Sequence, residues 1–121
     1  MKYMQKRKIL VSDIGEELVY INLSYPVFEK GVIKKQANIF YEQLADNYLS
    51  FASKALLPAA QKAKGQANFK PFSAVMAYEA KETEEKIIIS IRTFVFDGHT
   101  RTEGKITYQY WDKKTGIMSI K

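Results

Sequence analysis

The sequence contains no cysteine and only one histidine, His99. Without cysteine there is no disulfide framework, no thiolate metal site and no cysteine nucleophile. With one histidine, a catalytic triad or a multi-histidine metal site is either absent or needs other residues. The sequence therefore predicts no metal ion and no other cofactor.

Long apolar runs are also missing. The longest run is far shorter than the roughly 18–20 residues that a membrane-spanning helix needs, so we expect no membrane span. Residues 1–8 are basic, as at the start of a signal peptide, but only Ile-Leu-Val follows before Ser12, and no apolar signal region is present. Either the protein is made without an export signal or the sequence lacks its anchor, so the compartment stays open.

Acidic residues are outnumbered by basic ones. The chain has 19 Lys and Arg against 13 Asp and Glu, which gives a formal net charge of +6. The tightest basic clusters are residues 6–8 and 34–35, and the simplest interpretation is a solvated basic surface. No nucleic-acid-binding motif accompanies the charge, so nucleic acid is the weaker alternative partner.

Residues 32–64 have the period of one amphipathic helix. Pro58 cannot donate to the helical ladder, so we expect a kink or a short break close to it. Gly65 is a stop signal for the C-terminal end. The apolar positions recur at steps of three or four residues, at Ile33, Ala37, Phe40, Leu44, Tyr48, Phe51 and Ala55.

The hydrophobic period changes to two on both sides of this helix, which indicates strands. Residues 1–16 are expected to form a tail or a short strand. The predicted strands are 17–25, 72–80, 86–96, 105–111 and 117–121. The sequence thus predicts one α+β domain over residues 1–121, with a long helix packed across an antiparallel sheet of about four to five strands. Residues 69–121 form the β-meander of this domain.

The loop from Phe96 to Gly104 is chemically dense. It places Asp97, His99, Arg101 and Glu103 within seven residues. A hydrolytic interpretation makes Asp97 or Glu103 orient His99 as a general base, but no nucleophile stands at a defined spacing. A polar hairpin loop or a binding loop is the simpler interpretation. The acidic run at 82–85 and the turn at 112–116 are interpreted as solvated turns, because the ligand pattern of a calcium loop is missing.

The strand 105–111 carries a second group of candidates. Tyr108 and Tyr110 alternate to one face and Trp111 to the other. Such aromatic side chains provide a platform for sugars or for a partner chain, and ordinary core packing is the alternative. An exposed Trp111 beside Arg92 would mark a recognition surface.

Three short segments resemble a bacterial envelope family. They are INLSYPVF at 21–28 before the helix, SIRTFVF at 90–96, and YWDKKTG at 110–116. The family comprises the N-terminal module of PdaC-type peptidoglycan deacetylases and the extracytoplasmic part of RsiV-like anti-sigma factors. The loop differs from the family's usual Gly-Gly-Ala-His, because Asp-Gly-His-Thr stands at 97–100. The chain also stops where relatives continue into a second α/β portion.

The resemblance implies a non-catalytic α+β module with an extracytoplasmic or envelope-associated location. In RsiV-like proteins this part recognises lysozyme, and in PdaC-type proteins it accompanies an enzyme that acts on cell-wall glycan. We therefore expect a binding module for a protein or a cell-wall glycan, with homodimerisation through a free sheet edge as a further expectation. The alternatives are a small hydrolase or transferase that uses His99, and an electrostatic binder of nucleic acid. The candidate binding residues are Asp97, His99, Arg101, Glu103, Arg92, Tyr108, Tyr110 and Trp111.

Overall fold

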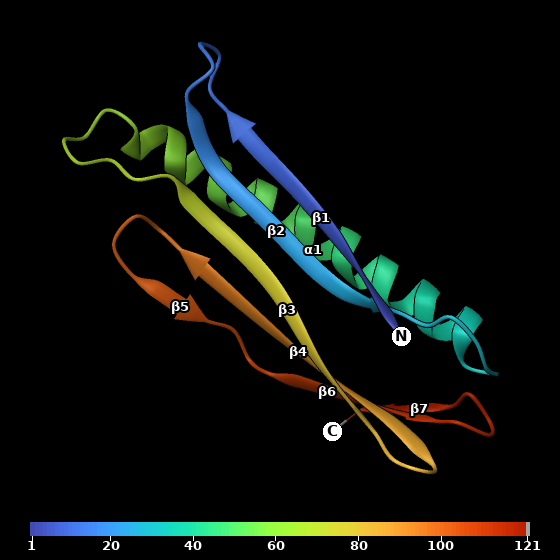
Figure 1. Ribbon diagram of the computed structural model, residues 1–121. Coiled ribbons are helices and arrows are strands. Elements are labelled where there is room, and N and C mark those ends of the chain that lie inside the picture. Colours follow the sequence, from blue (N-terminus) through green and yellow to red (C-terminus); the bar gives the residue numbers. More distant parts are fainter. Residues whose placement is uncertain (121) are drawn as a thin grey trace.

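One long helix and a seven-stranded sheet make up the fold, in a computed structural model that describes residues 1–120 (Figure 1). The elements are β1 (Lys2–Val11), β2 (Glu17–Val27), α1 (Lys34–Ala63), β3 (Phe72–Glu82), β4 (Lys86–Phe96), β5 (Arg101–Glu103), β6 (Thr107–Asp112) and β7 (Met118–Ile120). The expected α+β class is confirmed. The expected number of four to five strands is too low, because the sequence predicts only a tail or a short strand at residues 1–16 and a loop where β5 lies.

The sheet is mixed and not purely antiparallel. Its strand order is β1-β2-β3-β4-β6-β7, and β5 pairs with β4 beside β6. All neighbours are antiparallel except β2 and β3, which run parallel. The helix explains this exception. It carries the chain back along the sheet by about 45 Å at 1.5 Å per residue, so β3 starts at the same end as β2.

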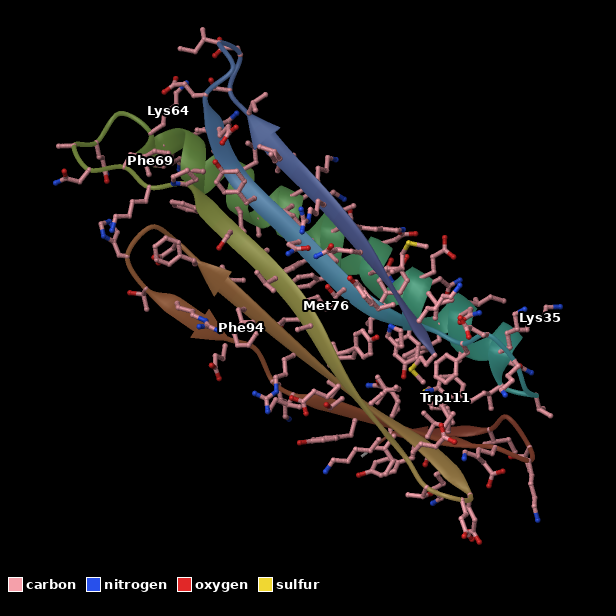
Figure 2. The ribbon with its side chains drawn as sticks, viewed as in Figure 1. Lys35, Lys64, Phe69, Met76, Phe94 and Trp111 are labelled. Atoms are coloured by element: carbon pink, nitrogen blue, oxygen red, sulfur yellow. The ribbon has the colours of Figure 1, made fainter. Side chains whose placement is uncertain are left out.

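The helix lies close to its predicted bounds but continues through Pro58. The expected break is absent, because Leu56 and Ala60 on either side of the exposed proline both pack into the core. This packing offsets the hydrogen bond that a proline removes. Lys35 and Lys64 mark the two ends of the helix in Figure 2. Among the described residues, no helix combines the length and the hydropathy that a membrane crossing needs.

The core lies between α1 and one face of the sheet, which we call the inner face. Small buried residues let the helix backbone approach the strands closely. On α1 these are Ala37, Ala45, Ala52 and Ala60. On the strands the largest fully buried side chains include Ile21, Leu23, Met76 and Ile89. In β2, β3 and β4 the predicted alternation therefore places the expected apolar residues on the inner face.

A polar network crosses this core near the start of the helix. The Tyr41 hydroxyl accepts a hydrogen bond from Trp111 Nε1 at 2.8 Å and donates one to Gln109 Oε1 at 2.9 Å. Burial raises the pKa of Tyr41 well above its ordinary value, so the hydroxyl stays protonated. Trp111 is only 3% exposed, so the interpretation of an exposed recognition tryptophan is wrong. Its indole N–H has a partner under the helix, which makes burial favourable.

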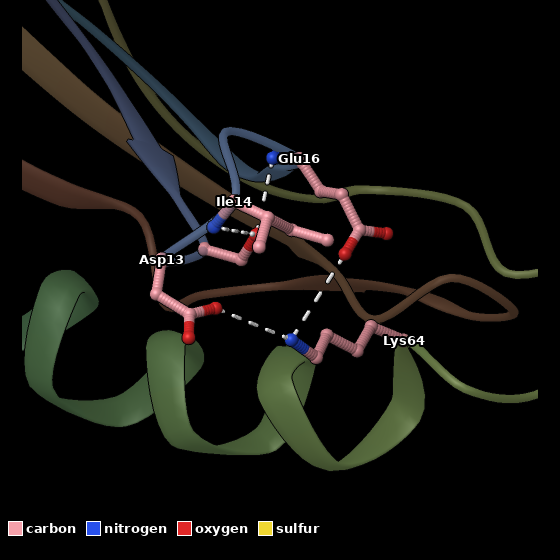
Figure 3. A network of polar contacts seen from close by, with 5 residues as sticks. Asp13, Ile14, Glu16 and Lys64 are labelled. Atoms are coloured by element: carbon pink, nitrogen blue, oxygen red, sulfur yellow. Dashed lines mark hydrogen bonds and ion pairs between the residues drawn. The ribbon is translucent and has the colours of Figure 1, made fainter.

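The turn between β1 and β2 is fastened to the other end of the helix. Ser12 Oγ accepts hydrogen bonds from the backbone N–H groups of Ile14 and Glu16. Lys64 Nζ lies 4.0 Å from carboxylate oxygens of both Asp13 and Glu16, as Figure 3 shows. These contacts hold the β1–β2 hairpin over the C-terminal end of α1.

Candidate functional site

The side of the sheet opposite α1 is not covered by any described helix, and we call it the outer face. Figure 1 views the sheet with α1 behind it. The strand registers fix which side chains share this face, because directly paired residues point to the same side. One row across the sheet consists of Arg7, Asn22, Val75, Phe94 and Glu103. The next row consists of Ile9, Tyr20, Ser73, Phe96 and Arg101.

Short side chains occupy the centre of the outer face. They come from β2 and β3 and are half-buried: Asn22, Ser24, Ser73, Val75 and Ala77. Four of these five positions are small or carry a hydroxyl or an amide group. Larger side chains of β1 and β4 stand on either side of them. The result is a broad surface with hydrogen-bonding groups at its centre.

Aromatic side chains are exposed on the same face. Tyr3 is 65% exposed, Tyr108 is 40% exposed and Tyr20 is 38% exposed. The Tyr20 hydroxyl donates a hydrogen bond to the Glu17 carboxylate, which raises the pKa of Tyr20. Phe94 and Phe96 are half-buried there. Exposed aromatic residues on an open surface are a common feature of recognition sites.

All three arginines of the sequence lie on the outer face. Arg7 is on β1, Arg92 on β4 and Arg101 on β5, and all three are exposed. The Arg101 guanidinium lies over the Phe94 ring, 4.1 Å from the ring centroid. Within residues 1–120, every recorded ion pair uses a lysine and none uses an arginine. In this part of the chain, the three guanidinium groups therefore form no ion pair with a carboxylate.

The predicted loop site is organised as a turn. Asp97 Oδ1 accepts hydrogen bonds from the backbone N–H groups of Thr100 at 2.7 Å and His99 at 2.9 Å. These two bonds lower the pKa of Asp97, with the Thr100 N–H contributing most. The bonded group of His99 is its backbone and not its ring. Asp97 thus stabilises the loop, and a role in orienting the His99 imidazole gains no support from these contacts.

The surroundings of His99 are open. The ring is exposed beside a hollow of only about 20 Å³, between the end of β4 and the loop before β3. A general base needs a substrate held within hydrogen-bond reach, and such a small hollow encloses little. Among residues 1–120 no group of three or more His, Asp and Glu residues is placed to hold a metal ion.

A larger cavity of about 320 Å³ lies at the opposite end of the sheet. Phe28, Ile33 and Ile87 are among its apolar lining residues, and Glu82 and Lys113 are among its charged ones. Lys113 Nζ lies 2.6 Å from a Glu82 carboxylate oxygen, and this bond lowers the pKa of Glu82. The acidic turn at 82–85 thus supplies an ion pair at this position.

The structure divides the predicted site residues into three groups. On the outer face it gathers Arg92, Arg101, Glu103, Tyr108 and Tyr110. At one end of the sheet it leaves Asp97 and His99, and in the core it buries Trp111.

The sequence analysis missed several residues of the outer face, among them Arg7, Tyr3, Tyr20 and Phe94. No local pattern marks Arg7, because residues 2–11 have no apolar stripe and the sequence predicts only a tail or a short strand there. Phe94 was assigned to the correct strand, but nothing local indicated that Arg101 would stack on it.

Neither a model of a known protein family nor a curated protein matches this chain. The fold itself places the chain in the α+β class, with one helix packed on a mixed sheet. The candidate functional site is the outer face of this sheet.

Proposed function

We propose that this chain is a non-catalytic binding module of the bacterial cell envelope, and that it binds cell-wall glycan on its outer face. The observation that carries the proposal is the combination of exposed tyrosines and unneutralised arginines on a sheet face without a helix. The resemblance of residues 21–28, 90–96 and 110–116 to PdaC-type and RsiV-like modules supports the envelope location.

The surface chemistry favours a sugar ligand. Aromatic rings offer apolar faces on which sugar rings stack, and a tyrosine hydroxyl adds a hydrogen-bonding group at the edge of its ring. Asn22, Ser24 and Ser73 add amide and hydroxyl groups at the centre of the face, where they lie within reach of sugar hydroxyls. A protein such as lysozyme is the other ligand that the resemblance implies. Tyrosine and arginine are also enriched at protein–protein interfaces, so binding assays with both ligands decide between them.

Catalysis has less support. The Asp97 carboxylate already accepts hydrogen bonds from the N–H groups of its own turn, and His99 is exposed to solvent. A hydrolase or transferase would need a nucleophile and an enclosed substrate position near this histidine. Neither is provided by the loop between β4 and β5.

Co-sedimentation with insoluble cell-wall glycan tests the proposal. We expect the wild-type chain to sediment with the wall material and a Tyr3→Ala/Tyr108→Ala variant to remain mostly in solution. Phe51→Ala is the matched control, since Phe51 is a 64% exposed aromatic residue on α1. The proposal fails if the wild-type chain stays in solution, or if the control loses binding as much as the tyrosine variant does.

Two further assays separate the alternatives. Lysozyme immobilised on a resin should retain less protein than wall glycan does, and the reverse result would replace the glycan with a protein ligand. Release of soluble fragments from the wall, abolished by His99→Ala in a folded protein, would favour the enzyme.

The expected homodimer stays a prediction. The β1 edge carries Lys2, Lys6, Arg7 and Lys8, and two such edges would repel each other when paired. An edge dimer is therefore better supported by the β7 side of the sheet. Sedimentation velocity over a range of protein concentrations measures whether the chain forms this dimer.

A further inference from the structure

The three arginines point to the chemical class of the glycan. We infer that the outer face binds an acidic glycan with widely spaced carboxylates, and that Arg7, Arg92 and Arg101 pair with them. This inference rests on the proposed function and adds the charge and the charge spacing of the ligand.

The distribution of basic residues is the first step. The lysines are spread over the helix, the loops and the strands, whereas the arginines occur only on the outer face. A guanidinium group presents a planar fork of N–H donors that fits a carboxylate bidentately. It also stacks on aromatic faces, as Arg101 does on Phe94. Sites that combine a sugar ring with an acidic substituent need both properties.

The spacing of the arginines is the second step. Arg101 pairs with Phe96, four residues along β4 from Arg92, so their Cα atoms are roughly 14 Å apart by strand geometry. Arg7 lies in the row of Phe94, three strands away, and roughly 16 Å from Arg92 by the same estimate. The Arg101 guanidinium leans from its position toward Phe94, which lies two residues from Arg92. Three side chains anchored on separate strands in this way can each contact a different acidic group, so they fit a polymer whose carboxylates are separated by whole sugar units.

Dense polyanions fit this face poorly. Duplex DNA carries one charge per roughly 1.7 Å of its axis and is held through many phosphate contacts. Three separated arginines neutralise few of these charges. Glu79 and Glu103 also lie on the outer face, opposite Ser90 and Phe94, where they would repel the extra charges of a dense polymer. A polyol phosphate chain also carries closely spaced negative charges, and it offers few ring faces for stacking.

The direct test measures binding to a soluble glycan of known charge. Hyaluronan carries a carboxylate on every second sugar, and its methyl ester is the neutral match. We expect the wild-type chain to bind hyaluronan at low salt and to bind the ester about tenfold more weakly. Single-stranded DNA and a polyol phosphate polymer are the competing polyanions, and preferential binding of either would overturn the inference.

Charge-matched variants identify the residues. Arg7→Gln/Arg92→Gln/Arg101→Gln removes three positive charges from the outer face, and Lys35→Gln/Lys54→Gln/Lys62→Gln removes three from exposed positions on α1. We expect the arginine variant to lose about tenfold or more in hyaluronan affinity and the lysine variant to stay within about twofold. An arginine-to-lysine triple variant, which keeps the charge but not the planar fork, should lie between them.

The outcomes separate this inference from the proposed function. If the arginine variant still binds hyaluronan or wall glycan like the wild type while the tyrosine variant does not, the face binds a neutral glycan and the inference is wrong. If the wild-type chain does not bind wall glycan, the proposed function is wrong. Circular dichroism and thermal melting of every variant verify that each one is folded.

Discussion

The Arg101 guanidinium lies over the Phe94 ring, with 4.1 Å between Cζ and the ring centroid. Arg101 pairs directly with Phe96, so its side chain leans across the sheet to the diagonal neighbour. Stacking restrains the guanidinium in a flat orientation on an open surface and leaves the N–H groups at its edge free. This pair links the stability of the short strand β5 to the chemistry of the outer face.

A double-mutant cycle measures this contact. Arg101→Gln, Phe94→Leu and their combination should give a coupling energy of about 0.5–1 kcal/mol in urea unfolding, the range for cation–π pairs at exposed sites. Arg92→Gln is the control, since no ring contact is recorded for that exposed arginine, and it should change the unfolding free energy by less than about 0.5 kcal/mol. A coupling energy of zero would mean that the two side chains do not interact in solution.

Acid stability depends on two aspartates that organise turns. The backbone N–H groups of Thr100 and His99 lower the pKa of Asp97, and those of Thr115 and Lys114 lower the pKa of Asp112. A carboxylate with a lowered pKa in the folded state contributes stability above its unfolded value, here about 3.8. That contribution is lost as the pH falls below 3.8 and through the lowered pKa.

The Asp97→Asn/Asp112→Asn variant tests this dependence. We expect it to lose less unfolding free energy than the wild type between neutral pH and pH values below 3.8, because its turns no longer titrate. Asp13→Asn is the control, since Asp13 contacts Lys64 at 4.0 Å and organises no such turn. Parallel stability curves for the wild type and the double variant would contradict the assignment.

Local patterns were sufficient for most of the fold. The amphipathic period placed the helix within two residues of α1, and alternation gave the inner face of β2, β3 and β4. Two features depend on long-range pairing instead. β1 is exposed on most positions and has no apolar stripe of its own, so only its pairing with β2 defines it as a strand. The three-residue β5 likewise exists because β4 extends beyond β6.

The outer face could be predicted only in part. Arg92, Tyr108 and Tyr110 stood out because polar and aromatic residues alternate in strands with a clear period. Arg7 is distant from them in sequence and joins them through three successive strand pairs. The alternation predicts the correct side of the strand for Trp111. Its hydrogen-bond partner on the helix, Tyr41, lies 70 residues earlier. No local pattern contains such a contact.

Tyr41→Phe should destabilise the core without changing its shape. The substitution removes the oxygen that serves both Trp111 Nε1 and Gln109 Oε1, and it leaves two buried polar groups without this partner. The expected cost is about 1–3 kcal/mol of unfolding free energy. Urea unfolding followed by tryptophan fluorescence measures it, since Trp111 is the only tryptophan. Tyr3→Phe is the control, because Tyr3 is 65% exposed, and an equal loss in both variants would show that the network contributes nothing.

Gly104 connects β5 to β6 along the same edge of β4, so it sets the relative positions of Arg101 and Tyr108. Its N–H donates to the Thr93 carbonyl oxygen at 2.8 Å, which holds it against β4. A Cβ atom at this position would clash with Thr93 Oγ1, so the threonine side chain must rotate away. We therefore expect Gly104→Ala to cost about 1–3 kcal/mol of unfolding free energy through overpacking.

The pair Gly104→Ala/Thr93→Ala separates this close contact from a general effect of adding a methyl group. Thr93→Ala removes the Oγ1 atom, so the double variant should be more stable than the sum of the single losses predicts. Gly65→Ala is the control, since nothing lies within 4 Å of the added Cβ there, and it should be close to neutral. Because Gly104 positions Arg101, the single variant should also bind acidic glycan more weakly. If Gly104→Ala matches Gly65→Ala in both stability and binding, β5 does not depend on this glycine.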